Sequence, residues 1–581
     1  GCIAGAIGWG AAVPDDRDEA VASELEAQGH PAGAQGSVDP EGQSPEEIRA
    51  EVEATAAELQ DQVPPEEERT LRAPVNPEDL TRDDMKQAFY NNEYGDADLA
   101  VMLFRRRFAR DNATEAYYRW QENRWHRCKN REQEGEFREL ADLYSKHAAA
   151  CAEDMKRAQA EDDKDSVARH KIWRDNFNKR AKALRGTARM RNVLTLATAG
   201  EGSLGVSGDH WNQDYQLLPV ANGVVDLETG KLREGRWDDW CNAGSPIEYA
   251  GYHHGGEFVP RFLDQLMCGS SELVDYLEHL LGFSVTGIQT KDFFVLYGPL
   301  GWNGKSVLME WVSRVLGEFA ATMPVEMIYE DRFGRDPDKP SPQVLRLRGL
   351  RLAVMSEPEG NKRLSPAKVK NLTSGTDRLQ GRTLNDKNVV MFDPTHTLVM
   401  HGNEVPRVMG HQRAFYDRLR LFPFRARFVR NQEEVDTARH VYLQTPRAEM
   451  EALLRKHDQE MLSFLIRCAR KALAKGDMPA PPAAVLQETR SFRDEEDLVG
   501  RYLRQCTDEV PDAHEQAKDL YRSFAYFCRE EIGLSAKQTP SLKAISADLR
   551  AQPHIERVES RTVLYYGIRI KADWVPADDW K

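Results

Sequence analysis

The sequence predicts a multidomain α/β protein, with a parallel sheet between a helical N-terminal region and a smaller C-terminal domain. Its 581 residues are too many for one hydrophobic core. Residues 291–430 alternate apolar strand-like runs with polar helical stretches, which is typical of a parallel α/β layer. Residues 75–200 have helical periodicity. Residues 495–575 are expected to form three helices followed by strands, the order of a winged helix.

The N-terminal segment carries almost all of the net negative charge. The formal net charge of the chain is −15, and residues 15–69 contain 17 Asp or Glu against only Arg17, Arg49 and Arg69. Large apolar residues are nearly absent there, so residues 15–70 are expected to be a disordered acidic linker, with a transient helix over 45–60. The rest of the chain is close to neutral, so the charge does not exclude a polyanionic partner. Because the chain begins at Gly1 rather than Met, we expect a fragment or a processed product.

Composition excludes several classes of protein. The chain is 40% hydrophobic and has no apolar run of about eighteen residues, so we expect no membrane span. Its 8 cysteines are scattered without a C-x-x-C pair, which indicates neither a disulfide framework nor a four-ligand zinc site. This pattern favours a cytoplasmic location.

Individual elements follow from local pattern. Val224–Leu227 and the following Glu228-Thr229-Gly230 predict a strand and a turn. The segment Lys171–Arg191 has eight basic residues and one acid, and forms either a solvated helix face or a DNA contact. Helices are expected over Phe258–Phe283 and Arg447–Ala474, and strands over Phe293–Tyr297, Leu352–Met355 and Thr397–Met400.

These patterns divide the chain into five expected parts. The parts are an acidic linker or remnant of an upstream domain (1–75), an N-terminal domain (76–257), the α/β domain (258–445), a helical connector (446–490) that contains the proline-rich stretch Pro479–Pro482, and a winged-helix domain (491–581).

The strand Phe293–Tyr297 leads into a glycine-containing loop that ends Gly304-Lys305-Ser306, and an apolar-periodic helix follows. Such a loop turns backbone N–H groups around phosphate oxygens, its lysine reaches the β and γ phosphates, and its serine hydroxyl ligates Mg²⁺. Five residues separate Gly298 from Gly304 instead of the usual four, so either the loop bulges or Gly301 takes the place of the first glycine. The expected ligands are ATP and Mg²⁺, and the expected nucleotide-binding residues are Gly298, Gly301, Asn303, Gly304, Lys305 and Ser306.

Two later strands end in polar residues that suit the same site. Leu352–Met355 continues into Ser356 and then Glu357 and Glu359, so we expect Glu357 to help hold Mg²⁺ with Ser306 and to act as the catalytic acid, with Glu359 in support. Thr397–Met400 runs on to Asn403, whose amide can hold the attacking water near the γ phosphate. His396 and His401 flank that strand and are given no role beyond packing or turn contacts.

The order and spacing of these motifs resemble the superfamily III helicases of the phage/plasmid and poxvirus-type primase–helicase family. Further stretches match that family: 368–377 with Gly381-Arg382 resembles its B′ motif, 415–424 its arginine-bearing segment, and 222–230 the core of its helicase-associated N-terminal domain. The resemblance extends over roughly residues 96–574 and is loosest at the winged helix.

The resemblance implies an AAA+ type P-loop ATPase core that works as a homo-hexameric ring on single-stranded or forked DNA. Arg418 matches the arginine finger that a neighbouring subunit supplies, with Arg420 as the second choice. Basic residues after the B′ motif line the channel in relatives, so Lys387 and Arg382 are the candidates for DNA binding. A primase domain or protein upstream also fits the resemblance.

Three functions remain open on the sequence alone. The first is an ATP-dependent DNA helicase for the replication of a phage, plasmid or similar mobile element. The second is an AAA-type ATPase switch or loader that remodels protein partners without unwinding. The third, ranked last, is a DNA-binding initiator with an inactive ATPase, because Ser356 occupies a position where Asp is commoner.

Overall fold

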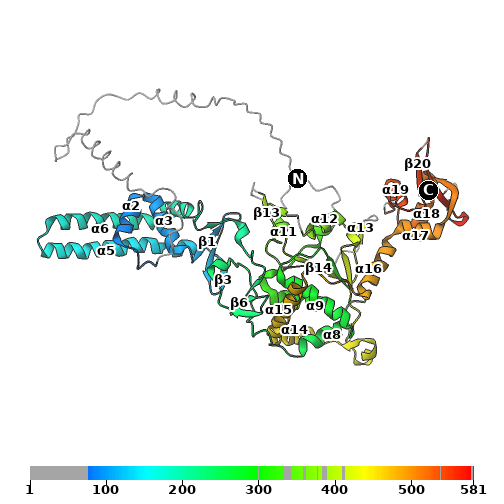
Figure 1. Cartoon of the computed structure of the whole chain (residues 1–581), viewed down its shortest axis with the longest axis horizontal. Coiled ribbons are helices and arrows are strands. Elements are labelled where there is room, and N and C mark those ends of the chain that lie inside the picture. Colours follow the sequence, from blue (N-terminus) through cyan, green and yellow to red (C-terminus); the bar gives the residue numbers. More distant parts are fainter. Residues whose placement is uncertain are drawn as a thin grey trace, which may run out of the picture. The chain divides into compact units, whose positions relative to one another are not determined.

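The computed structural model describes residues 76–298, 300–330, 342–356, 362–375, 377–382, 389–408, 413–536, 538–559, 561–577 and 580 (Figure 1). The acidic segment 15–70 and its expected helix therefore lie outside the described residues. Among the helices that are described, none combines the length and the apolar character needed to cross a bilayer.

The N-terminal region is mostly helical, as its periodicity predicts. Two long antiparallel helices, α5 and α6, form a hairpin that packs against α2, α3 and α7 through a shared core (Figure 1). Phe137, Tyr144, Phe177 and Leu184 are fully buried in that core. Asp163 begins α6 by accepting a hydrogen bond from the Ser166 N–H at 3.0 Å, the usual N-cap geometry. The helices are α2 (Arg82–Tyr90), α3 (Asn92–Phe104), α4 (Glu132–Glu136), α5 (Arg138–Ala160), α6 (Lys164–Leu184) and α7 (Thr187–Ala197).

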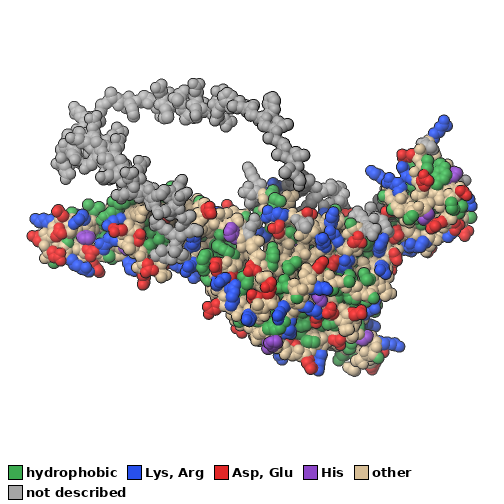
Figure 2. All heavy atoms as spheres, viewed as in Figure 1, with side chains coloured by type: hydrophobic (Ala, Val, Ile, Leu, Met, Phe, Trp, Pro, Cys, Tyr) green, Lys and Arg blue, Asp and Glu red, His purple; other side chains and the backbone are tan. Residues whose placement is uncertain are grey.

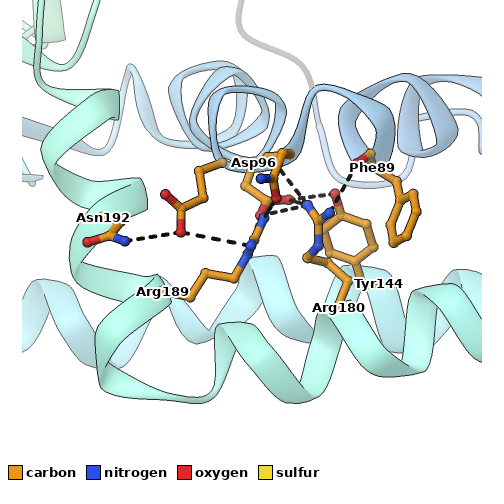
Figure 3. Close-up of polar contacts among 8 residues, drawn as sticks. Phe89, Asp96, Tyr144, Arg180, Arg189 and Asn192 are labelled. Atoms are coloured by element: carbon orange, nitrogen blue, oxygen red, sulfur yellow. Dashed lines mark hydrogen bonds and ion pairs between the residues drawn. The ribbon is translucent and has the colours of Figure 1, made fainter. Parts of the chain in front are cut away.

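A buried carboxylate joins four of these helices. Asp96 on α3 is fully buried and lies between the guanidinium groups of Arg180 on α6 and Arg189 on α7, at 2.9 and 2.6 Å (Figure 3). The Tyr144 hydroxyl on α5 donates to the same carboxylate at 2.7 Å. Arg180 also donates to the Phe89 carbonyl at 3.0 Å. The charge of Asp96 is therefore fully compensated inside the domain.

This network uses two of the eight basic residues in Lys171–Arg191. Arg185 and Arg174 form further ion pairs, with Asp142 and Asp175 respectively. On the face shown in Figure 2, Lys and Arg side chains over α5 and α6 are interspersed with Asp and Glu. Part of the basic run is therefore structural, and it does not make a uniformly positive surface.

The prediction of helix throughout 75–200 was wrong for residues 108–127. They form three antiparallel strands, β1 (Phe108–Asp111), β2 (Ala116–Gln121) and β3 (Arg124–Arg127), in a sheet of order β3-β2-β1-β4 with β4 (Gly205–Val206). Tyr118 and Trp120 are strong strand formers, and Glu122, with a left-handed φ of 58°, lies in the turn between β2 and β3. Trp125 stacks on Trp240 at 5.6 Å, which anchors the sheet to the chain that follows.

A second small sheet carries the predicted strand and turn. β5 (Leu217–Val220), β6 (Gly223–Asp226) and β7 (Lys231–Arg233) form an antiparallel meander. Gly230 adopts φ +69°, and a Cβ there would overlap the Tyr252 ring, so glycine is required at this turn. Leu218 and Val225 join the core of the central sheet.

The central sheet is parallel throughout, as expected, with the order β16-β8-β14-β10-β9. Its side chains alternate between two cores. Phe294 and Leu296 of β8 face one core with α8, α9, α10 and α15, and Phe293 and Val295 face the other. Parallel sheets are normally covered on both faces in this way. The strands are β8 (Phe293–Tyr297), β9 (Ala320–Thr322), β10 (Leu352–Ser356), β14 (Thr397–Gly402) and β16 (Leu419–Pro423).

Two expected long helices are each divided. Cys268 and Gly269 are left-handed and Ser270 caps the next helix, so 258–283 forms α8 (Phe258–Leu266) and α9 (Ser271–Thr286). Residues 447–474 form α14 (Arg447–Lys456) and α15 (Asp458–Lys475), with His457 between them. The other helices here are α10 (Lys305–Leu316), α11 (Pro342–Leu345), α12 (Pro366–Leu372) and α13 (Arg413–Tyr416).

Three strand pairs lie beside the central sheet, and short 3-10 turns connect several elements. β12 (Leu379–Gly381) and β13 (Val390–Phe392) pair as an antiparallel hairpin, while the pairs β11 (Arg363–Leu364) with β15 (Arg407–Val408) and β17 (Arg427–Val429) with β18 (Val441–Leu443) are parallel. The 3-10 turns are η2 (Gly208–His210), η3 (Trp237–Asp239), η4 (Gly317–Phe319), η5 (Val325–Ile328), η6 (Gln432–Glu434), η7 (Thr437–Arg439) and η8 (Ala572–Trp574).

Arg351, directly before β10, connects three of these parts. Its guanidinium is buried and donates to the Val285 carbonyl of α9 at 2.6 Å and to the Leu217 carbonyl of β5 at 2.7 Å. It also lies 4.2 Å from the centre of the Phe319 ring. Burial lowers the pKa of Arg351 to about 10, so the side chain remains charged at neutral pH.

The C-terminal region has three helices and a three-stranded antiparallel sheet around its own core, which contains Tyr502, Phe524 and Ile568. The sequence missed β19, since this stretch is polar and contains a proline. The winged-helix interpretation remains a prediction. The elements are α17 (Leu498–Cys506), β19 (Thr507–Gln516), α18 (Ala517–Glu530), α19 (Leu542–Arg550), β20 (Glu556–Glu559) and β21 (Val563–Ile570). Helix α16 (Ala483–Glu496) precedes them and packs against β16.

Replacing Asp96 should destabilise the helical region locally. Asp96→Ala leaves two buried or half-buried arginines without their carboxylate, which typically costs about 3–5 kcal/mol. Hydrogen–deuterium exchange should show faster exchange of the α3, α6 and α7 amides. Asp142→Ala, which removes an exposed ion pair with Arg185, is the matched control and should change local stability by less than about 1 kcal/mol. Equal exchange in the two variants would contradict a stabilising role for the network.

Candidate functional site

The loop between β8 and α10 is built around two glycines. A Cβ at Gly298 would overlap the side-chain amide of Asn303, which donates to the Phe424 carbonyl at 3.3 Å. Gly301 adopts φ +64° and faces the Asn403 side chain, and Gly304 adopts φ +79° immediately before α10. Gly298 and Gly301 thus have separate conformational roles, so the longer loop uses both positions that the sequence left open.

Lys305 is the first residue of α10 and its side chain is almost completely buried. Its ammonium donates to the Gly298 carbonyl at 3.2 Å, to the Asn303 side-chain oxygen and to the Asn403 side-chain oxygen at 3.1 Å. These three acceptors are neutral, and burial lowers the pKa of Lys305 to about 8. A buried cation held only by dipoles at a helix N-terminus is well suited to bind an anion.

Ser306 follows Lys305, and its hydroxyl lies 3.4 Å from His401 Nδ1. His401 belongs to β14 and is buried. No role in the site was expected for His401, yet the structure brings it next to the candidate Mg²⁺ ligand. His396, at the other end of the strand, is fully buried, and burial lowers its pKa to about 4, so its ring stays neutral.

The strands that carry the motifs end at one edge of the sheet. Leu296 of β8, His401 of β14 and Ser356 of β10 are aligned across the sheet, so β14 lies between the loop strand and the strand that precedes the acidic residues. Asn403, just beyond β14, therefore reaches Lys305. Glu357 and Glu359 lie outside the described residues.

The two candidate arginines lie at the opposite edge. The Arg418 backbone carbonyl accepts from Phe293 N–H at 2.8 Å, at the first residue of β8, and its guanidinium donates to the Thr373 carbonyl at 2.6 Å. The five residues of β8 span about 17 Å, so Arg418 cannot reach the loop of its own chain. A site for Arg418 at a nucleotide would have to belong to a neighbouring subunit.

Arg420 is held by an internal partner. It forms an ion pair with Asp292 at 2.9 Å, and both side chains are largely buried. Burial raises the pKa of Asp292 to about 6. This pairing favours Arg418 over Arg420 as the arginine available to another subunit.

The residues expected to bind DNA lie at the β12–β13 hairpin. Arg382 directly follows β12, and Lys387 falls in the connection between the strands, outside the described residues. The hairpin packs on the central sheet through Leu379 and Phe392, which are buried in the same core as Phe293.

The described residues fit a magnesium nucleotide better than a protein-held metal. They contain no group of three His, Cys, Asp or Glu side chains that could hold a metal ion. Mg²⁺ bound with a nucleotide needs few protein ligands because phosphates and water supply the others. The Ser306 hydroxyl, beside a buried lysine that lacks a carboxylate partner in its contacts, provides the described part of such a site.

Comparison with known proteins supports the sequence resemblance. A family profile described as "D5 N terminal like" matches residues 97–268. "Putative helicase L207/L206" of Acanthamoeba polyphaga mimivirus is 24% identical over 331 residues, which are 54% of this chain and 33% of the relative. "Putative helicase 184R" of Invertebrate iridescent virus 6 is 27% identical over 248 residues, 40% of this chain and 25% of the relative. The chain spans a third or less of the length of these two relatives.

Solved structures give weaker matches. The NrS-1 C terminal region (305–718) aligns with 54% of this chain and 76% of that chain at 12% identity, with a TM-score of 0.30. A JCV helicase with a bound acetamide compound aligns with 41% of this chain and 60% of that chain at 14% identity, with a TM-score of 0.23. The family assignment therefore rests on the sequence matches, and these agree with the motifs: the chain is a relative of the superfamily III helicases of the primase–helicase type.

Proposed function

We propose that this chain is the motor of an ATP-dependent DNA helicase that acts in the replication of a virus, plasmid or similar mobile element. The observation that carries the proposal is Lys305, buried at the start of α10 and bonded to the loop and to Asn403. The names of the two viral relatives, "Putative helicase L207/L206" and "Putative helicase 184R", suggest the class of activity.

The proposed site divides phosphate binding, metal binding and water activation among a few residues. Lys305 and the N–H groups that begin α10 would hold the β and γ phosphates, and Ser306 would ligate Mg²⁺ with Glu357. Bound Mg²⁺ neutralises charge that develops on the phosphates. Asn403 would position the attacking water, and Glu357, supported by Glu359, would accept its proton.

The position of Arg418 supports assembly into a ring. Because Arg418 lies about one strand length from its own loop, it can stabilise γ-phosphate charge only at the site of a neighbour. We propose a homo-hexamer in which Lys387 and Arg382 contact single-stranded DNA in the channel.

Replacing the loop lysine, Lys305, should abolish both ATP hydrolysis and DNA unwinding. Lys305→Ala should lower ATP hydrolysis by at least about a hundredfold, since it deletes the cation that the phosphates require. The measurements are phosphate release and strand displacement on forked DNA. Lys456→Ala, on the exposed side of α14, is the control and should retain both. If the wild-type protein hydrolyses ATP but displaces no strand, the result favours the AAA-type switch or loader instead.

Nucleotide affinity should fall as the pH rises above about 8. The pKa of Lys305 is about 8 in the free protein, and a bound phosphate would raise it, so binding above this pH takes up a proton. Affinity should therefore decrease by up to about tenfold per pH unit above 8. Calorimetry in buffers of different ionisation enthalpy should detect uptake of up to one proton near pH 9. A constant affinity from pH 7 to 9.5 would contradict the depressed pKa.

Two inactive variants should restore activity when mixed. Arg418→Ala should bind nucleotide but not hydrolyse it. In a mixed ring, a site between two subunits is complete when the Arg418→Ala subunit supplies Lys305 and its Lys305→Ala neighbour supplies Arg418. Random equal mixing makes about a quarter of interfaces complete, which sets the expected fraction of wild-type ATPase. Mixing Lys305→Ala with wild-type protein calibrates subunit exchange. If exchange occurs without rescue, the arginine does not act between subunits.

A further inference from the structure

A cavity of about 410 Å³ lies away from the phosphate loop, where the β1–β4 sheet meets the β12–β13 hairpin and the turn after α11. Its volume is within the range of small-molecule sites, about 300–1,000 Å³. The walls come from six separate stretches of the chain, and all the lining residues are among those described. Neither the family profile nor the proposed ATPase site gives this cavity a role.

Aromatic rings form much of the wall. Tyr118, Trp211, Tyr215 and Phe392 line the cavity. The Tyr118 and Trp211 rings pack with centroids 4.6 Å apart, and Trp211 belongs to the tryptophan cluster that includes Trp125. These rings are therefore held in place by the fold before any ligand binds. Fixed aromatic faces bind flat π systems without losing much conformational freedom.

Arg348 contributes a cation with unused hydrogen-bonding capacity. One guanidinium nitrogen, Nη1, lies 3.6 Å from the Asp111 carboxylate. The other, Nη2, is buried and has no hydrogen-bond partner among the described residues. The guanidinium lies so close to Gly208 that a Cβ there would overlap it. Buried polar groups without partners are uncommon in folded proteins and call for an explanation such as a missing ligand.

Asp111 places an acceptor beside this donor. Its carboxylate is almost fully buried and accepts from Ala113 N–H at 2.8 Å, from Thr114 N–H at 3.3 Å and from the Trp211 indole N–H at 3.2 Å. A carboxylate has about four acceptor sites, so these three hydrogen bonds leave capacity for one more. A donor and an acceptor side by side, between aromatic walls, match the edge and the faces of a nucleobase.

The location also favours a nucleobase. Phe392 is the last residue of β13, so the cavity adjoins the β12–β13 hairpin. The proposed DNA-binding residues Arg382 and Lys387 lie in the sequence between the two strands of this hairpin. We propose that the cavity binds one unstacked nucleobase of the single strand held at this hairpin, with Arg348 bonding its edge. This inference rests on the proposed function, because that function supplies the DNA strand from which the nucleobase comes. A free nucleotide is the other possible source of the nucleobase.

The test uses two probes and a matched pair of variants. One probe is a single-stranded oligonucleotide with one 2-aminopurine, whose fluorescence is quenched by stacking; the other is deoxyguanosine monophosphate. Arg348→Gln removes the free donor. Arg346→Gln is the control, because Arg346 is exposed two residues earlier and donates to the Thr322 carbonyl at 3.3 Å. Arg348→Gln should weaken oligonucleotide binding about tenfold and reduce quenching, whereas Arg346→Gln should match wild type within about twofold.

Two further variants separate binding from folding. Gly208→Ala keeps Arg348 but displaces its guanidinium, and Tyr215→Leu removes one aromatic wall; both should weaken the same probe. Far-ultraviolet circular dichroism and thermal unfolding of each variant identify any that misfold. The proposal is supported if all the variants that fold bind the oligonucleotide more weakly than the wild-type protein does.

The outcomes separate this inference from the function. Loss of monophosphate binding alone would support a nucleobase site and identify the free nucleotide as its source. Unchanged binding of both probes by folded Arg348→Gln and Tyr215→Leu would overturn the inference and leave the helicase proposal intact. If the wild-type protein binds no oligonucleotide, the proposed function fails, and the monophosphate measurement then decides whether the cavity is a nucleobase site.

Discussion

The buried guanidinium of Arg351 connects the β5–β7 sheet and helix α9 to the central parallel sheet. Burying a cation without a carboxylate is costly, so its hydrogen bonds to Val285 and Leu217 must form together for the fold to be stable. Its backbone carbonyl also accepts from Thr397 N–H at 2.9 Å, which sets the start of β14 beside β10. Helix α9, strand β5 and the first residues of two central strands are therefore positioned by one residue, through its side chain and its backbone.

Different candidate site residues lie at the two ends of the central strands. At the carboxyl edge, Lys305 and Asn403 meet because β8 and β14 are neighbours in register. At the amino edge lies Arg418, on the far side of the strand from the loop of its own chain. Under the proposed function, Arg418 and a phosphate loop would meet only when two subunits associate.

The sequence predicts what depends on continuous local pattern. The strands β8, β10 and β14 agree with their predicted starts, because each is an apolar run bounded by polar residues. β2 and β19 were missed: the first lies inside a helix-rich region, and the second is polar and pairs through its backbone with β21. The breaks at Gly269 and His457 were also missed, since apolar spacing continues across them.

The same distinction applies to the site. Lys305, Ser306 and Asn403 could be selected because their motif carries its own strand and helix signals. His401 could not, since its approach to Ser306 depends on the order of strands in the sheet. The ion pairs of Asp96 with Arg180 and Arg189 could not be predicted from the sequence either, because three helices must pack together before the carboxylate is enclosed.

The alternation of side chains along β8 has a mechanical consequence. Phe294 and Leu296 belong to the core shared with β5 and β6, whereas Phe293 and Val295 belong to the core that holds the β12–β13 hairpin. The sheet acts as a rigid partition between these two apolar compartments. Repacking in the compartment under the hairpin can shift the hairpin while the junction with the N-terminal domain stays in place. In the proposed motor, the β12–β13 hairpin would move while the rest of the domain stays in place.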